Sequence, residues 1–157
     1  MGRFKVVTIV GTRPEAIKMA PVLQAISQRA DIFEHQLLAA AQQREMFDQA
    51  LSIFGIRPDI DLDLMQRNQS LTDFASRALS VLSGSLEELR PDAILVQGDT
   101  TTVMAAGLAA FYLGVRVCHV EAGLRSFDLA RPFPEEVNRR ITSCITDLHF
   151  APTEGAR

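Results

Sequence analysis

The sequence has little cysteine and no excess charge of one sign. Both of its cysteines, Cys118 and Cys144, lie in apolar stretches, where a free cysteine usually behaves as a small buried hydrophobe. We therefore expect no disulfide and a reducing compartment, the cytoplasm. The chain carries 16 Lys and Arg against 19 Asp and Glu, which argues against a general affinity for nucleic acids or anionic membranes. A local basic site for a small anionic ligand remains compatible with this balance.

Long hydrophobic runs are also missing. The longest stretch of low polarity, Val103–Val115, contains two glycines and is shorter than the roughly 20 residues that a membrane span needs. We expect it to be a core helix. The first apolar segment, Val6–Val10, is too short for a signal peptide. A chain of 157 residues can bury roughly 68–70% of its unfolded surface, so neither disulfides nor a structural metal are needed.

Several sequence motifs of known chemistry are absent. Gly11-Thr12-Arg13 does not match the G-x-G-x-x-G pattern of dinucleotide sites, and the chain has neither a P-loop motif nor a G-x-S-x-G nucleophile elbow. Its three histidines fall on separate expected strands without the spacing of metal ligands on a helix. We expect no metal and no cofactor.

Short apolar runs alternate with helical patterns along the whole chain. Five runs are typical of strands buried on both faces, with a further short strand expected at Asp61–Met65; the five are Phe4–Val10, Gln36–Ala41, Ala93–Val96, Val115–Val120 and Leu148–Ala151. Alternating strands and helices predict a parallel sheet with right-handed crossovers. The expected fold is therefore a Rossmann-like α/β domain, residues 1–157, with helices on both faces of the sheet.

Helix ends can be placed from the sequence. Ser70 and Asp73 form a capping box before a helical pattern, Gly114 ends the next helix, and Pro134 opens the last one. The sequence stops just after its last strand, where another helix is due. We therefore expect the chain to be part of a longer protein.

Polar clusters follow four of the expected strands. Because ligands of open parallel sheets bind outside the carboxyl ends of the strands, we expect these clusters to share one edge. They are residues 11–18, 42–45, 97–102 and 121–126, with the cations Arg13, Lys18, Arg44 and Arg125 and the carboxylates Asp99 and Glu121. This mixture suits a phosphorylated substrate on which a proton is also moved.

Each of these residues has a plainer structural interpretation. Arg13 and Lys18 could be solvated charges, and Asp99 could cap a helix. Glu121 is harder to explain this way, because a carboxylate directly after a buried strand needs a partner. The spacing of Glu135 with Arg139, and of Glu136 with Arg140, fits surface salt bridges within one helix.

At these clusters the chain resembles the non-hydrolysing UDP-N-acetylglucosamine 2-epimerase family. The matching segments come in the family's order and span nearly the whole chain: Gly11–Lys18, Gln43–Met46, Gly98–Thr102, His119–Arg125, Pro134–Arg139 and Phe150–Glu154. The resemblance covers only the amino-terminal half of the family. It implies a second Rossmann-like, UDP-binding domain that this chain lacks, as in two-domain glycosyltransferases, with the active site between the two domains.

The resemblance implies that UDP-N-acetylglucosamine and UDP-N-acetylmannosamine are interconverted without a cofactor. UDP leaves C1 while a base removes the C2 proton, and UDP adds back to the 2-acetamidoglucal intermediate after protonation from the other face. By motif position the acid and base candidates are Asp99, Glu121 and Glu135, and the groups that bind the leaving diphosphate are Arg13, Lys18 and Arg139. Gathered carboxylates are expected to raise the pKa of at least one of them.

The resemblance also implies a regulatory site and a homodimer of the full-length protein. A second UDP-N-acetylglucosamine would bind as an effector at Gln42, Gln43 and Arg44, although Gln43 stands where members commonly carry histidine. Polysaccharide synthesis for the cell envelope or capsule is the implied pathway. Two alternatives stay open: a nucleotide-sugar-binding module without catalysis, and a hydrolysing epimerase that releases UDP and free N-acetylmannosamine.

Overall fold

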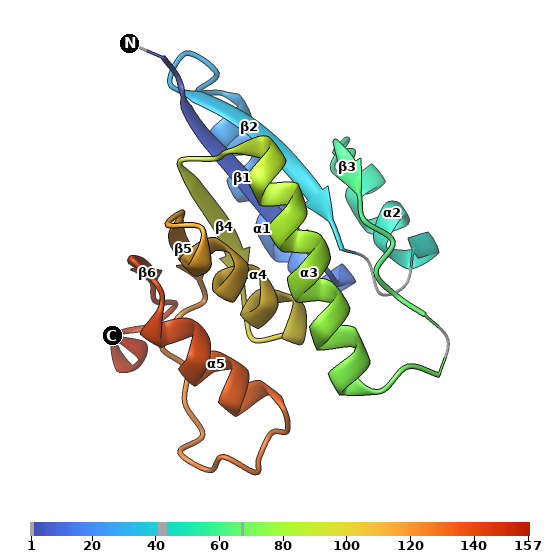
Figure 1. The fold of residues 1–157 in the computed structure, drawn as a ribbon. Coiled ribbons are helices and arrows are strands. Elements are labelled where there is room, and N and C mark those ends of the chain that lie inside the picture. Colours follow the sequence, from blue (N-terminus) through green and yellow to red (C-terminus); the bar gives the residue numbers. More distant parts are fainter. Residues whose placement is uncertain (1, 41–43, 67) are drawn as a thin grey trace.

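The fold is a six-stranded parallel sheet between helices (Figure 1). The computed structural model describes residues 2–40, 44–66 and 68–157, with the side chains of residues 44–48 left aside. In the order in which they lie side by side, the strands are β3 (Ile60–Asp61), β2 (Phe33–Ala39), β1 (Phe4–Val10), β4 (Ala93–Gln97), β5 (Arg116–Val120) and β6 (Leu148–Phe150). The predicted α/β class is confirmed.

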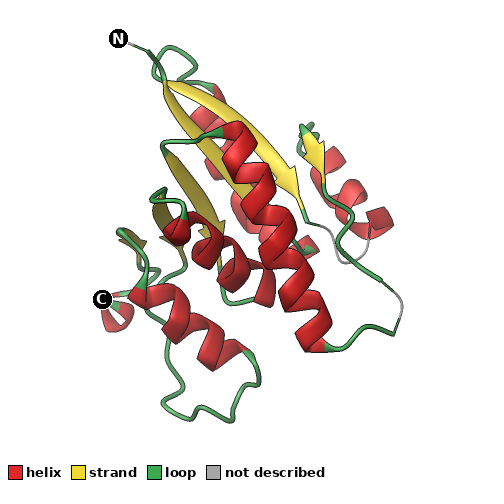
Figure 2. Ribbon diagram, viewed as in Figure 1, coloured by secondary structure: helices red, strands yellow, loops and turns green. Residues whose placement is uncertain are grey.

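Helices cover both faces of the sheet, as Figure 2 shows. They are α1 (Arg13–Ser27), α2 (Arg44–Ile53), α3 (Leu71–Leu89), α4 (Thr101–Tyr112), α5 (Glu135–Cys144) and the short 3-10 helix η1 (Glu154–Ala156). Helices α3 and α4 bury one apolar cluster with alternate residues of β1, such as Val7 and Ile9. The opposite residues, Val6 and Val10, belong to a second cluster with α1 and α2. This alternation is why the central strands are apolar throughout.

The helix ends at Ser70, Gly114 and Pro134 lie where the sequence predicts them. Ser70 accepts a hydrogen bond from the Asp73 amide, and Asp73 bonds back to the Ser70 amide, so the predicted capping box of α3 is confirmed. Gly114 lies just beyond α4 with a φ of 68°, and Pro134 is the N-cap residue of α5. A second capping box, formed by Thr12 and Glu15 at the start of α1, was not predicted.

Two expectations about burial are wrong. Strand β6 is exposed along its three residues because it is a sheet edge with β5 as its partner, and Cys144 at the end of α5 is exposed rather than buried. Strand β2 also begins earlier than Gln36, and β3 is shorter than Asp61–Met65. None of the helices in the part of the chain that the structure describes has the length and apolarity that a membrane crossing requires.

The direction in which the chain adds strands to the sheet reverses between β1 and β4. From β1 the chain builds outward through β2 to β3, and it then returns to the other side of β1 and continues through β4, β5 and β6. The loops after β1 and β4 therefore leave in opposite directions, and a crevice opens between them. Such a switch point is where open α/β sheets bind their ligands.

Candidate functional site

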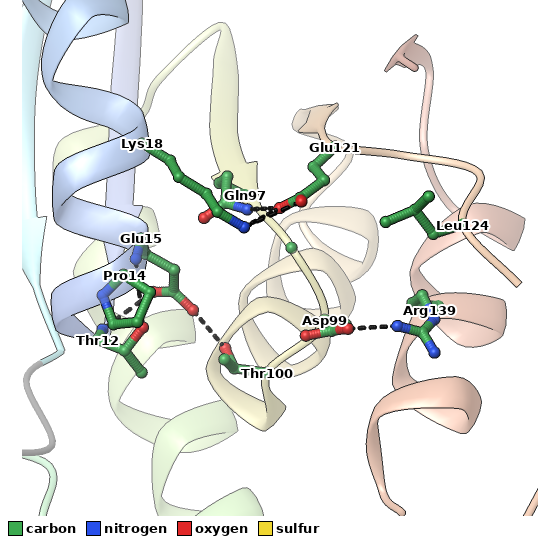
Figure 3. Close-up of a pocket in the computed structure, with 11 residues that line it drawn as sticks. Thr12, Pro14, Glu15, Lys18, Gln97, Asp99, Thr100, Glu121, Leu124 and Arg139 are labelled. Atoms are coloured by element: carbon green, nitrogen blue, oxygen red, sulfur yellow. Dashed lines mark hydrogen bonds and ion pairs between the residues drawn. The ribbon is translucent and has the colours of Figure 1, made fainter. Parts of the chain in front are cut away.

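A pocket lies at this switch point (Figure 3). Its volume is about 380 Å³. Its wall comes from the start of α1 and the residue before it, from the end of β4 and the loop that follows, from the loop after β5 and from α5. The lining residues are Thr12, Pro14, Glu15, Lys18, Gln97, Gly98, Asp99, Thr100, Glu121, Leu124 and Arg139. Three of the four predicted polar clusters thus meet at one edge of the sheet. Most of the fourth cluster, residues 42–45, lies outside the described residues or side chains.

Glu121 and Lys18 form an ion pair across the pocket. The Lys18 Nζ donates to both carboxylate oxygens of Glu121, at 2.9 and 2.7 Å, and the Gln97 amide donates to one of them (Figure 3). Glu121 directly follows β5 and has a φ of 62°, a left-handed conformation that non-glycine residues rarely adopt. The partner that a carboxylate at this position requires is therefore Lys18, from the opposite wall.

Asp99 is held from the other side of the pocket by α5. Its carboxylate pairs with Nη1 of Arg139 at 2.5 Å, and its carbonyl oxygen accepts a hydrogen bond from the buried Asn138 amide at 3.0 Å. The alternative role of Asp99 as a helix cap is wrong. Thr100 caps α4 instead, through the bond from the Val103 amide to its hydroxyl.

Arg139 lies between two carboxylates. Besides Asp99 it pairs with Glu136, at 3.2 Å, and Glu136 also pairs with Arg140 at 2.9 Å and accepts the amide of Ser126 at 3.0 Å. These bonds hold the pKa of Glu136 at about 2, below its ordinary value of 4.5, chiefly through the Ser126 amide. The predicted Glu136–Arg140 pair exists, but Glu136 is fully buried, so a surface salt bridge is the wrong description. The other predicted pair, between Glu135 and Arg139, is not formed; the ion pairs of Arg139 in the described structure are with Asp99 and Glu136.

Glu15 is a site residue that the sequence analysis missed. The residue is 4% exposed, and its carboxylate accepts hydrogen bonds from the amides of Gly11 and Thr12 and from the hydroxyl of Thr100. Burial raises its pKa to about 7, more than these bonds lower it. This is not the raised pKa that the sequence analysis expected among Asp99, Glu121 and Glu135 from gathered carboxylates, because it belongs to another residue and burial causes it. The Thr12-x-x-Glu15 spacing was the available signal for its capping role.

His119 supports the loop that carries Asp99. One ring nitrogen lies 2.7 Å from the carbonyl oxygen of Gly98 and donates to it. Burial lowers the pKa of His119, which keeps the ring neutral. Within the described ranges no group of three or more His, Cys, Asp or Glu side chains could hold a metal ion.

Three of the predicted site residues do not line the pocket, and three others lie outside the described residues or side chains. Arg13, the first residue of α1, is exposed. Glu135, the first residue of α5, is half-buried, and one of its oxygens is buried without a hydrogen-bond partner among the described residues. Arg125 points elsewhere and donates to Leu124 and Ser143. Gln42 and Gln43 lie outside the described residues, as does the side chain of Arg44.

An open parallel sheet with charged loops at its switch point defines the Rossmann-like class of α/β ligand-binding domains. Residues 24–157 match the model of the UDP-N-acetylglucosamine 2-epimerase family. The chain belongs to this family. A likeness to a MurG structure from Acinetobacter baumannii, with a TM-score of 0.60 at 18% identity, concerns the fold alone.

Close relatives carry the family name. The chain is 54% identical over 154 residues to the UDP-N-acetylglucosamine 2-epimerase of Yersinia pestis, covering 98% of this chain and 41% of the relative. It is 48% identical over 157 residues to the enzyme of that name from Bacillus subtilis strain 168, covering 100% and 41%. The chain therefore spans about two fifths of the length of these relatives.

Solved structures agree with the relatives. A Neisseria meningitidis epimerase bound to UDP-GlcNAc superimposes with a TM-score of 0.93 at 50% identity, over 98% of this chain and 42% of that chain. A Methanocaldococcus jannaschii epimerase in complex with UDP-GlcNAc and UDP gives a TM-score of 0.90 at 35% identity, over 98% and 41%. The backbone fold of this chain is thus closely similar to the matching part of these two structures.

Proposed function

We propose that this chain is the amino-terminal part of a non-hydrolysing UDP-N-acetylglucosamine 2-epimerase. One observation carries the proposal: two carboxylates from different loops, Asp99 and Glu121, face one pocket, and each is paired with a cation from another wall. Carboxylates can move the C2 proton, and cations can neutralise a departing diphosphate. A site for this reaction needs both kinds of group within reach of one sugar.

The two ion pairs suggest how the charges are used. Lys18 is half exposed at the pocket mouth, whereas Arg139 is 12% exposed and fixed from both sides. An arriving diphosphate competes with Glu121 for Lys18 and with Asp99 for Arg139. As the nucleotide sugar binds through its diphosphate, the carboxylates are released from their cations and become free to exchange a proton with C2.

A mechanism in which UDP is eliminated from the sugar explains why no redox cofactor is required. Loss of the diphosphate gives C1 oxocarbenium character, and this acidifies the adjacent C2–H. The C2 proton then leaves to a carboxylate, and a 2-acetamidoglucal and UDP are formed. Protonation of C2 from the opposite face and return of UDP to C1 complete the inversion. Glu135, one helical turn before Arg139, is the third acid or base candidate by family resemblance.

The rest of the active site belongs to a second domain in this proposal. That domain supplies the uridine contacts and a further histidine, and the complete protein forms a homodimer. We also place the effector site for a second UDP-N-acetylglucosamine at Gln42, Gln43 and Arg44. The chain alone then has little or no activity, because its pocket forms one wall of an interdomain cleft.

Deuterium exchange at C2 tests the proposal. The chain alone is compared with a chimera in which it replaces the matching 157 residues of the Bacillus subtilis relative. Both are given UDP-N-acetylglucosamine in deuterated water, and label at C2 and release of UDP are followed by NMR. Asp99→Asn is compared with Asp31→Asn, which removes an exposed carboxylate that also pairs with an arginine.

The chimera is expected to label C2 without net release of UDP, and Asp99→Asn, but not Asp31→Asn, is expected to lose most of this activity. Release of UDP with free N-acetylmannosamine would establish the hydrolysing alternative. Binding without labelling by the chimera would favour a binding module. Labelling by the chain alone would refute the division between two domains.

A further inference from the structure

Glu15 contacts two helix ends that are far apart in the sequence. One carboxylate oxygen accepts the amides of Gly11 and Thr12, at 2.5 and 3.1 Å, where α1 begins. The other accepts the hydroxyl of Thr100 at 2.8 Å, at the N-cap of α4 (Figure 3). The Thr100 hydroxyl oxygen also accepts a hydrogen bond from the Val103 amide, and its single proton is donated to Glu15.

Helix capping does not account for the burial of this carboxylate. Helix α3 has the same kind of capping box, Ser70 with Asp73, and there the carboxylate is exposed. Burial of a carboxylate is costly, and among the described residues no cation pairs with Glu15. Its partners are the neutral donors named above. Glu15 has two contacts that Asp73 lacks, to the amide of Gly11 and to the hydroxyl of Thr100. Only the contact to Thr100 joins Glu15 to another helix.

The two helix ends are also packed closely. A Cβ atom placed on Gly11 would lie 2.8 Å from the Thr102 hydroxyl oxygen, so glycine is what lets the loop after β1 approach α4. The functional groups lie on either side of this contact. Lys18 is one turn after Glu15 on α1, and Asp99 immediately precedes Thr100.

We propose that Glu15 is a positioning residue that ties the amino terminus of α1 to that of α4 and so fixes the separation of Lys18 and Asp99 across the pocket. This inference rests on the proposed function, because it gives Glu15 its role in the same reaction. A misplacement of about 1 Å between groups that act together can cost about 100-fold in rate.

A change in the length of the side chain at position 15 separates the contact to Thr100 from the capping of α1. In Glu15→Asp the shorter carboxylate can still complete the capping box, as Asp73 does in α3, but it does not reach Thr100. In Glu15→Gln the amide keeps the reach and loses the charge. The matched control is Asp73→Glu, which changes the same group in the remote capping box.

Two measurements are made on these variants. In the chimera, Glu15→Asp is expected to lower kcat about 10-fold to 100-fold with little change in KM, Glu15→Gln to retain most of the activity, and Asp73→Glu to have no effect. In the chain alone, hydrogen exchange of the Val103 amide, followed by NMR, is expected to speed up in Glu15→Asp and to stay unchanged in Asp73→Glu.

The outcomes distinguish this inference from the proposed function. Unchanged exchange at Val103 in Glu15→Asp would overturn the tie. Faster exchange with unchanged kcat would make Glu15 a structural residue only. If the unsubstituted chimera does not label C2, the proposed function fails, and exchange at Val103 alone decides whether the two helix ends are tied.

Discussion

Glu15 makes the stability of this chain depend on pH in a direction unusual for a carboxyl group. Its pKa in the folded protein is about 7, against an ordinary value of 4.5, because burial disfavours the ionised form. Between these two values the folded protein holds a proton that the unfolded chain has already released. The stabilisation from this proton is fully present below pH 4.5 and is lost as the pH rises to about 7.

The size of the effect follows from the two pKa values. A tenfold change in proton affinity is worth about 1.4 kcal/mol, so the gap between 4.5 and about 7 corresponds to roughly 3 kcal/mol, most of it lost between pH 5 and pH 8. Glu15→Gln carries no titrating group there. We therefore expect the free energy of unfolding of Glu15→Gln, relative to the unsubstituted chain, to rise by about 2 to 3 kcal/mol between pH 5 and pH 8.

Urea denaturation at both pH values measures this difference. Asp73→Asn serves as the control, because hydrogen bonds from Ser70 lower the pKa of Asp73 and its stabilisation is lost only as the pH falls through the acidic range. Asp73→Asn should show no gain between pH 5 and pH 8. An equal difference between Glu15→Gln and the unsubstituted chain at both pH values would refute the burial argument for Glu15.

Two further predictions concern the close packing at Gly11 and the charge of Glu136. Gly11→Ala should destabilise the fold by about 1 to 3 kcal/mol in thermal unfolding, because the added Cβ would lie 2.8 Å from the Thr102 hydroxyl oxygen. The control Gly84→Ala, which has open space around it inside α3, should stabilise the fold by up to about 1 kcal/mol. Equal effects of the two substitutions would contradict the close approach at Gly11. Glu136→Gln should lower the stability at pH 7, and the deficit should shrink as the pH falls below 4.5 towards about 2, because the stabilisation from the low pKa of Glu136 is lost in that range. A deficit that does not change with pH in this range would show that Glu136 acts without its charge.

The edge of the sheet that carries the site was predictable, because it follows from the parallel direction of the strands. Short apolar runs identified β1, β4 and β5, and the polar clusters that follow them contribute Lys18, Asp99 and Glu121 to the pocket lining. The carboxyl ends of parallel strands lie at one edge whatever the side chains do. Charged residues placed directly after such strands are therefore informative even in a single sequence.

The burial of Glu15 and Glu136 was not predictable from local pattern. The spacing of Glu136 and Arg140 indicates only that they are neighbours on one helix. The Ser126 amide that donates a hydrogen bond to the buried Glu136 comes from the loop before α5. Glu15 has the spacing of an ordinary capping box, and its burial depends on α4, some 85 residues away. Both depend on contacts between distant segments, which periodicity does not encode.

The central claim, that the switch-point pocket binds the diphosphate of a nucleotide sugar, is tested most directly by titrating this chain with UDP and following its amide resonances. The account predicts shifts concentrated at Thr12–Lys18 and at Gly98–Thr100, with smaller ones in the first turn of α5, and their loss when Lys18→Met and Arg139→Met are combined. Shifts confined to other surfaces, or undiminished in the double variant, would contradict it.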